Sequence, residues 1–314
     1  MTRSQWGVKL NWDPSTGWGF VFSTLGVNLV KIGLAGAFAV AGAASGIGLG
    51  GLSAYIISQA LYHWASSNYS GTIVTTETII SDREQEGLDA DRAYVAICGP
   101  SGSGKSSLIN ALRGLLNRDT NAASVGTTET TCQRQEYQAA ACFDRLTLVD
   151  FPGAGTQRVP SQGYFNANKL HCYDYILIIC GERFGEIEIA LVQACIAQGK
   201  RFAIVRSRSD EAIRRVEDDM SLPLDEAKLS YIEDEISAIE EELRRASLPE
   251  ENIVELLGFF ILLNKNTLRR LTTIPPYDWP SAFGQDEIHE RKLLQLLGKA
   301  GVADEHVNPG AEGE

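Results

Sequence analysis

The residues best suited to chemistry lie between Gly99 and Ser106, in the pattern G-x-x-x-x-G-K-S. Glycines allow the backbone to curl, so that successive N–H groups point inward at an anion. An apolar, strand-like run (Tyr94–Cys98) precedes the pattern, and a helix-like pattern follows from near Lys105, whose N-terminal dipole favours negative charge. A chance Gly/Ser loop is the alternative. The strand–loop–helix context instead predicts a site for the phosphates of a nucleotide.

Two side chains of this segment have predicted roles. The Lys105 ammonium is expected to reach the β- and γ-phosphates, and the Ser106 hydroxyl is expected to bind Mg²⁺. The predicted nucleotide-binding residues of the segment are Gly99, Ser101, Gly102, Ser103, Gly104, Lys105, Ser106 and Ser107.

A second element distinguishes a nucleotide hydrolase from a bare phosphate loop. The next apolar strand ends in "LTLVDFPGAG", which places Asp150 at its C-terminal end and Gly153 three residues later. A carboxylate here can hold Mg²⁺ through water, and the Gly153 N–H can sense the γ-phosphate. A simple turn at the strand end is the alternative, but the order after the phosphate loop favours the functional interpretation.

The segment between these two elements, "SVGTTETTCQRQEY" (124–137), is rich in threonine. A threonine hydroxyl can complete the Mg²⁺ shell and order such a loop only when the γ-phosphate is present. Thr130 and Thr131 are the candidates, and an ordinary polar loop or edge strand is the alternative. One of these two threonines would complete the predicted Mg²⁺ ligands with Ser106 and Asp150.

Base recognition is predicted after two later strands. In "RFAIVRSRSD" (201–210), the Asp210 carboxylate can accept hydrogen bonds from guanine N1 and N2, and Ser207 and Arg208 precede it. Arg208 stands where GTPases usually have a lysine whose stem stacks on the base, and arginine can also stack. Asn264, in "ILLNKN" (261–266), is either near guanine O6 or at a plain strand end.

Composition narrows the class of protein. The chain has 314 residues and a net charge of −12, with a pI near 4.9, which argues against binding nucleic acid through its phosphates. The six cysteines contain no C-x-x-C pair and are interpreted as buried, reduced thiols of a cytosolic protein. The four histidines have no metal-ligand spacing.

Apolar strands alternate with helical patterns from Tyr94 to about Gly298, which predicts βαβ units and a parallel sheet. The strand candidates are Tyr94–Cys98, Leu146–Val149, Tyr175–Cys180, Arg201–Val205 and Gly258–Leu263. The predicted domains are an N-terminal tail (1–23), an apolar helical hairpin or membrane segment (24–66), a connector (67–92), the nucleotide domain (93–300) and a disordered acidic tail (301–314).

The apolar block of residues 24–64 exceeds the roughly 20 residues needed to cross a bilayer. Gly42, Gly46 and Gly50 form a repeated G-x-x-x-G pattern, which lets helices pack closely in lipid. We expect a membrane-inserted hairpin with both ends in the cytosol. The alternatives are a helix pair buried against the nucleotide domain, a segment exposed upon nucleotide exchange, and a signal peptide, which the late start and great length disfavour.

A further helical pattern, residues 224–247, has apolar residues in 3-4-3-4 spacing and two Glu–Arg pairs at i,i+4 on its solvent-exposed faces. This helix packs on its own sheet or offers a partner-binding seam, and it is too short for a stable coiled coil alone. The apolar positions are Leu229, Ile232, Ile236, Ile239 and Leu243.

Residues 90–298 resemble the immunity-related GTPases, also called interferon-inducible p47 GTPases. The resemblance rests on "VAICGPSGSGKSSLINALRG", "VGTTETT" and the run from "LVDFPGAG" to "FAIVRSRSD", and more weakly on "FFILLN". It implies a Ras-like P-loop GTPase domain with a mostly parallel sheet, GTP hydrolysis, Mg²⁺ and nucleotide-dependent self-association at membranes. The matching site positions are Gly99, Gly104, Lys105, Ser106, Thr131, Asp150, Gly153 and Asp210. The resemblance thus selects Thr131 as the threonine that binds Mg²⁺ with Ser106 and Asp150, and it implies Lys105, Thr131 and Gly153 as catalytic residues.

The expected function is therefore that of a cytoplasmic, membrane-associated protein that hydrolyses GTP to GDP. Ala154 stands where small GTPases often have a water-orienting glutamine, so we expect slow turnover, stimulated by a second copy in a homodimer or homo-oligomer. Glu129 is a weak candidate for positioning water or a partner nucleotide. The alternatives are a GTP-gated scaffold without hydrolysis and a membrane-disrupting effector that uses residues 24–64.

Overall fold

The computed structural model describes residues 49–69, 71–72, 74–125, 133–154, 163–275, 278–279 and 286–301. The chain divides into two compact units, Met1–Ile57 and Ser58–Glu314. The site and the sheet belong to the second unit. The domain boundaries expected from the sequence stay predictions.

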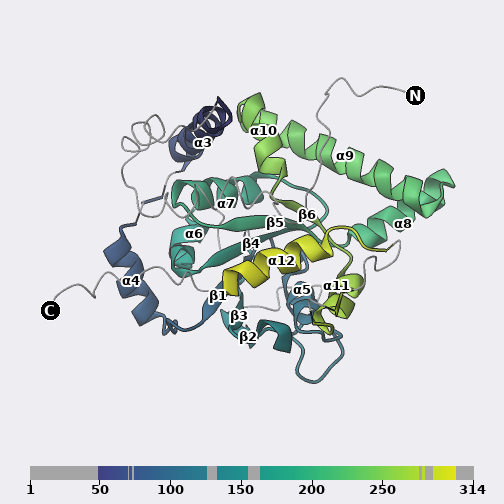
Figure 1. The fold of residues 1–314 in the computed structure, drawn as a ribbon, viewed down its shortest axis with the longest axis horizontal. Coiled ribbons are helices and arrows are strands. Elements are labelled where there is room, and N and C mark those ends of the chain that lie inside the picture. Colours follow the sequence, from purple (N-terminus) through teal and green to yellow (C-terminus); the bar gives the residue numbers. More distant parts are fainter. Residues whose placement is uncertain are drawn as a thin grey trace. The chain divides into compact units, whose positions relative to one another are not determined.

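A six-stranded sheet forms the centre of the second unit (Figure 1). All neighbouring strands are parallel except the β2–β3 pair at one edge, which confirms the predicted α/β fold with a mostly parallel sheet. In spatial order the strands are β2 (Gln135–Gln138), β3 (Leu146–Asp150), β1 (Ala93–Cys98), β4 (Tyr175–Cys180), β5 (Phe202–Arg206) and β6 (Phe260–Leu262).

The composition of the strands explains their positions. β4 (YILIIC) is buried along its whole length, as expected for a parallel strand covered on both faces. β2 (QEYQ) is polar and mostly exposed, and it lies at the edge. Its polar sequence is why the 124–137 segment could be interpreted either as a loop or as an edge strand.

Helices cover both faces of the sheet (Figure 1). The described helices are α3 (Leu49–Asn68), α4 (Thr76–Gln85), α5 (Lys105–Leu112), η1 (Ala141–Phe143), α6 (Tyr164–Ala167), η2 (Leu170–Cys172), α7 (Glu186–Ala197), α8 (Ser209–Met220), α9 (Leu224–Arg245), α10 (Glu250–Leu257), α11 (Lys265–Thr272) and α12 (Glu290–Gly301).

Alternation along β1 separates two hydrophobic cores. Val95 and Ile97 pack with side chains of α5, α11 and α12 on one face. Ala96 and Cys98 pack with side chains of α6, α7 and the end of α3 on the other. Because β1, β3, β4, β5 and β6 are parallel, the loops that follow them gather at the C-terminal ends of these strands, where ligands of such folds bind.

The C-terminal half of α3 belongs to the second core. Trp64 and Ala65 are buried there, and the Trp64 Nε1–H donates to the Ala246 carbonyl at 2.9 Å. Residues 24–48 of the apolar block lie outside the described residues. Among the helices that the structure describes, none combines the length and the hydrophobicity needed to cross a membrane.

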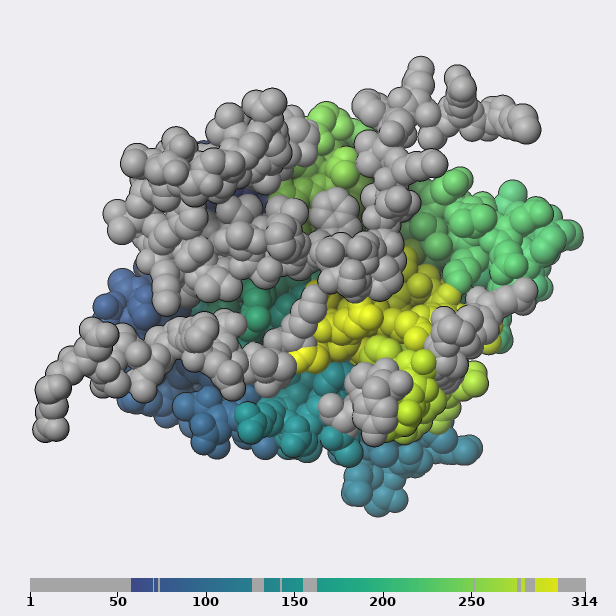
Figure 2. Space-filling model, in the orientation of Figure 1, coloured from purple at the N-terminus to yellow at the C-terminus, as the bar shows by residue number. Residues whose placement is uncertain are grey.

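The apolar stripe of α9 divides into two parts. Ile239 and Leu243 are buried, whereas Leu229 and Ile236 are 62% and 38% exposed. Figure 2 shows the green surface of α8 and α9 beside the yellow surface of α12. The C-terminal half thus packs on the domain through Ile239 and Leu243, and the N-terminal half packs through Ala227 and Tyr231, with Ile232 beside them. Of the predicted partner seam, only the positions Leu229 and Ile236 are exposed among these described residues. Both predicted i,i+4 pairs form, Glu240 with Arg244 and Glu241 with Arg245.

Four cysteines within the described part of the chain, Cys98, Cys172, Cys180 and Cys195, are free and buried. Burial raises the pKa of the Cys98 and Cys180 thiols to about 12, so these side chains stay neutral at physiological pH. They behave as small apolar residues of the core, as the sequence predicts.

Candidate nucleotide-binding site

The predicted phosphate loop follows β1 at the C-terminal edge of the sheet, and α5 begins at Lys105. Gly99 has φ = +137°, and a Cβ atom there would lie 2.2 Å from the Ile179 carbonyl oxygen. Only glycine therefore fits, because the loop turns in direct contact with the backbone of β4.

Lys105 is buried beneath the loop that it is predicted to serve. Its Nζ donates to the carbonyl oxygens of Gly99 at 3.2 Å and Pro100 at 2.8 Å. A buried ammonium needs such partners, and a bound phosphate would offer stronger, charge-assisted ones.

The structure brings two predicted Mg²⁺ ligands together. Ser106 Oγ donates to Asp150 Oδ2 at 2.7 Å, and both side chains are buried. Hydroxyl and carboxylate oxygens are ligands that Mg²⁺ prefers, so the donor set fits this ion. The third predicted ligand, Thr131, lies outside the described residues, as do Glu129 and Thr130.

The D-F-P-G segment packs directly on the phosphate loop. The Ala154 N–H donates to the Gly99 carbonyl at 3.0 Å, and a Cβ atom on Gly153 would lie 2.6 Å from Ser101 Cα. Gly153 is thus beside the loop, as its predicted role requires. The Tyr164 hydroxyl fixes the turn from the other side by donating to the Pro152 carbonyl at 2.6 Å.

Other predicted residues of the loop differ in exposure. Ser101 and Gly102 are exposed, whereas Ser103 is buried and its hydroxyl has no hydrogen-bond partner. The half-buried Ser107 accepts from Asn117 Nδ2 at 3.2 Å.

The predicted base-reading segment also contacts the phosphate loop. Ser207 Oγ donates to the Ser103 carbonyl at 2.6 Å. Arg208 is exposed and has φ = +58°, a strained backbone conformation for a residue with a side chain. Together these contacts bring the two loops, which are about a hundred residues apart in the sequence, to one place.

Asp210 has an unsatisfied oxygen. Its Oδ1 is buried without a hydrogen-bond partner, and burial, followed by the nearby charge of Glu211, raises the pKa of the carboxyl group. A ligand that donates hydrogen bonds to this carboxylate would offset the cost of burying it. The exposed edge of guanine, with its N1–H and N2–H groups, is such a ligand.

Asn264 has a local structural role. Its Oδ1 accepts from the backbone N–H groups of Asn266 at 3.0 Å and Thr267 at 3.3 Å and so caps α11, while its Nδ2 donates to the Asp286 carbonyl. Asn264 and Asp210 line the same hollow. The predicted contact of Asn264 with guanine O6 stays a prediction.

A buried carboxyl group beneath Asn264 could not be found from the sequence. Glu290, the first residue of α12, has no exposed surface and accepts from the N–H groups of Asn264 at 2.5 Å and Ile288 at 2.6 Å. Burial raises its pKa to about 7. Nothing in the run "DEIHERK" separates this glutamate from Glu287 and the other charged neighbours, which are only half-buried or exposed.

Glu290 should make stability depend on pH. Its folded-state pKa of about 7 exceeds the ordinary 4.5, so its stabilising contribution is present below pH 4.5 and is lost as the pH rises through 7. We expect the melting temperature of wild type, relative to Glu290→Gln, to fall by several degrees from pH 5 to pH 8, because one pKa unit corresponds to about 1.4 kcal/mol. Differential scanning calorimetry would measure this. A constant difference over that range would contradict it.

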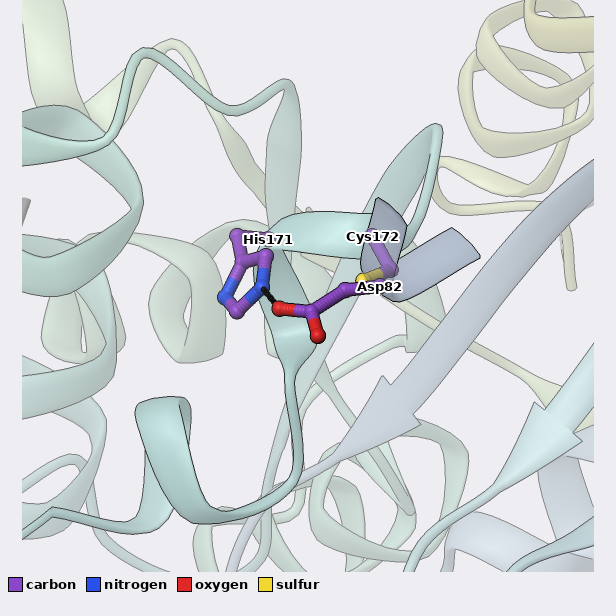
Figure 3. A group of neighbouring side chains, drawn as sticks. All are labelled: Asp82, His171 and Cys172. Carbon is purple, nitrogen blue, oxygen red and sulfur yellow. Dashed lines mark hydrogen bonds and ion pairs between the residues drawn. The ribbon is translucent and has the colours of Figure 1, made fainter. Parts of the chain in front are cut away.

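A second polar cluster, also unexpected from the sequence, lies where α4 contacts η2. Asp82, His171 and Cys172 have donor atoms within 4.8 Å of one another (Figure 3). His171 Nε2 lies 2.8 Å from Asp82 Oδ2, and Lys169 Nζ lies 3.0 Å from Asp82 Oδ1. Residues so far apart in the chain have no ligand spacing that a sequence could reveal.

Comparison with known proteins decides the family. The family model described as "Interferon-inducible GTPase (IIGP)" matches residues 61–261, well over half of the chain. The chain belongs to the interferon-inducible GTPase family. The resemblance to immunity-related GTPases, drawn from the phosphate loop, the D-F-P-G segment and the base-reading segment, is thereby confirmed.

Individual IIGP relatives are moderately similar. "Interferon-inducible GTPase 1" of Mus musculus is 31% identical over 210 residues, covering 67% of this chain and 47% of the relative. "Interferon-inducible GTPase 5" of Bos taurus is 41% identical over 123 residues, covering 39% of this chain and 26% of the relative. The chain thus spans about half, or less, of the length of these family members.

Solved structures with similar architecture are more distant. "LeoA bacterial dynamin GTPase from ETEC" aligns with a TM-score of 0.44 and 16% identity, over 79% of this chain and 43% of that one. Toc33 from Arabidopsis thaliana, in a dimerization-deficient mutant, aligns with a TM-score of 0.42 and 13% identity, over 73% of this chain and 91% of that one.

Proposed function

We propose that this chain binds GTP and hydrolyses it to GDP and phosphate with the help of Mg²⁺. The contact between Ser106 Oγ and Asp150 Oδ2, 2.7 Å long and beside the phosphate loop, is the observation that carries the proposal. Membership of the IIGP family, whose members are named as GTPases, supports it.

Each part of the site has one task in this proposal. The amides from Gly99 to Ser107 cradle the phosphates, and Lys105 binds the β- and γ-phosphates. Ser106, Asp150 and Thr131 hold Mg²⁺, which neutralises charge that develops on the phosphate oxygens. Gly153 senses the γ-phosphate, and Ser207, Arg208, Asp210 and Asn264 form the base-binding side.

Hydrolysis needs a group that orients water, and Ala154 offers none from its side chain. Ala154 is also buried, and its N–H is bonded to Gly99. We therefore propose that turnover by a single copy is slow and that a second copy, docked across the nucleotide in a homodimer or homo-oligomer, supplies the missing group.

Turnover should then depend on protein concentration. We expect the GTP turnover per molecule to rise at least about tenfold between dilute and concentrated protein, since a group supplied in trans is worth factors of 10³ or more in related chemistry. Phosphate release from GTP and from ATP, with lipid vesicles present, would measure both this rise and base specificity. A rate per molecule that is constant over the whole concentration range would contradict assembly-stimulated hydrolysis.

Ala154 also favours one other function. A scaffold that holds GTP with negligible turnover would need the phosphate loop and the Mg²⁺ ligands but no water-orienting group. Binding of GTP with no phosphate release at any concentration would identify it.

For either function we propose a cytoplasmic site of action and association with membrane lipid through residues 24–64, which flotation with vesicles would test. Leakage of those vesicles would instead favour the membrane-disrupting effector.

A further inference from the structure

Helix α4 is attached to the nucleotide domain by charge. It has no fully buried side chain, so packing of an apolar face, the usual source of helix stability in proteins, is weak here. Its polar side chains instead make specific contacts. These contacts form two sets, which we call arms. The first arm reaches the segment from Lys169 to Asp174, and the second reaches the segment that begins at Arg134.

The first arm runs through Asp82. Both of its carboxylate oxygens are engaged, Oδ1 by Lys169 at 3.0 Å and Oδ2 by His171 at 2.8 Å. These hydrogen bonds, that of His171 first, lower the pKa of Asp82, which is therefore ionised at neutral pH. Lys169 holds this position in a strained backbone conformation, with φ = +47°.

The cluster in Figure 3 is thus better explained as an ion network than as a metal centre. The carboxylate of Asp82 is already neutralised by Lys169, and the side chain of Arg83 lies near as well, bonded to the Cys172 carbonyl. Burial raises the pKa of the Cys172 thiol to about 11. A neutral thiol is a poor metal ligand.

The same arm continues toward the Mg²⁺ site. Tyr173 follows η2 directly and is fully buried. Its ring packs edge-on against Phe151, with the ring centroids 5.2 Å apart. Phe151 is the neighbour of Asp150 in the chain, so α4 reaches the proposed Mg²⁺ ligand through a short series of packed side chains.

The second arm runs through Glu86, the residue that ends α4. Its carboxylate forms ion pairs with Arg134 and, at 3.3 Å, with Lys169, and its carbonyl also accepts from Arg134. Gln135, next to Arg134, pairs with Asp150 in the antiparallel β2–β3 register. Both arms therefore end at Asp150 from two different sides.

We propose that Asp82 and Glu86 are positioning residues for Asp150, so that α4 sets how well the site binds Mg²⁺. The inference rests on the proposed function, since Asp150 has a role only if Mg²⁺ and a nucleotide bind. Single ion pairs at a surface are weak. Here Asp82, Glu86, Arg134 and Lys169 form one connected network of ion pairs, and Arg134 also donates to the Glu86 carbonyl. The network ties two segments to one helix, the one that leads into β2 and the one that leads to Tyr173.

The test compares isosteric variants on α4. In Asp82→Asn and Glu86→Gln, we expect the Mg²⁺ concentration that half-maximally slows GDP release to rise about tenfold, as when groups behind a metal ligand are removed. GDP affinity in EDTA should change less than twofold. Glu84→Gln, an exposed glutamate on the same helix, is the matched control and should behave as wild type.

Two results would overturn the inference. One is an Mg²⁺ response in both variants equal to that of Glu84→Gln. The other is an equal loss of GDP affinity with and without Mg²⁺, which would mean that the network only supports the fold. If either variant lacks a cooperative melting transition, Arg134→Gln removes the Glu86 contact from the opposite side and carries the same expectations. Wild-type protein that binds no GDP would instead overturn the proposed function itself.

Discussion

Replacing Lys105 with alanine is expected to weaken the binding of GTP by about a hundredfold or more. The side chain is buried, and its ammonium lies against the carbonyls of Gly99 and Pro100, inside the turn that is to hold the phosphates. A hydrogen bond to a charged group contributes about 1.5–3 kcal/mol, and Lys105 is expected to make at least one to each of two phosphates. Isothermal titration calorimetry with GTP and Mg²⁺ would measure the loss.

Arg145→Ala is the matched control for the loss of one positive charge. Arg145 is exposed and directly precedes β3, at the end of the sheet opposite the phosphate loop. Its GTP affinity should equal that of wild type. If Lys105→Ala folds and binds GTP within threefold of wild type, the triphosphate does not lie on this loop.

Replacing Asp210 with asparagine should change which base is bound. The two carboxylate oxygens can accept hydrogen bonds from guanine N1–H and N2–H. The asparagine amide keeps only one acceptor oxygen, and its NH₂ group, a donor, would face the other guanine donor. Sites built for a specific hydrogen bond discriminate strongly when it is lost, so we expect GDP affinity to fall roughly a hundredfold. Xanthosine diphosphate has a carbonyl in place of the N2 amino group, and its affinity should rise.

Asp218→Asn is the control for this substitution. Asp218 lies on the same helix, α8, and is exposed. Calorimetry with both diphosphates on both variants would separate base recognition from a general loss of charge. Unchanged preference for GDP over xanthosine diphosphate in Asp210→Asn would show that this carboxylate does not contact the base.

The parallel part of the sheet could be predicted because its strands are largely apolar. The runs at Tyr94–Cys98 and Tyr175–Cys180 are bounded by glycine or polar turns, and they agree with the observed strands to within a residue. The edge strand β2 carries no such signal, since its side chains face solvent and its pairing depends on β3 alone. Tertiary pairing, and not local sequence, makes it a strand.

The approach of Ser106 to Asp150 could also be anticipated from the sequence. In a parallel sheet the ends of neighbouring strands meet at one edge, so residues just after β1 and at the end of β3 must lie close together. Asp82, Glu86 and Glu290 had no comparable signal. Their partners, at Lys169, Arg134 and Asn264, are far away in the chain, and an exposed and a buried glutamate look alike in a sequence.

Because ion pairs hold α4 on the domain, its attachment should depend on the salt concentration of the solution. Attractions between partly exposed charges are screened by dissolved ions over about 8 Å at physiological ionic strength, whereas buried apolar contacts are not. Salt near 1 M, which shortens this length to about 3 Å, should therefore loosen α4 while leaving both hydrophobic cores intact. An anionic surface close to Arg134 and Lys169 would compete for the same cations, so the attachment of α4 should respond to its electrolyte environment.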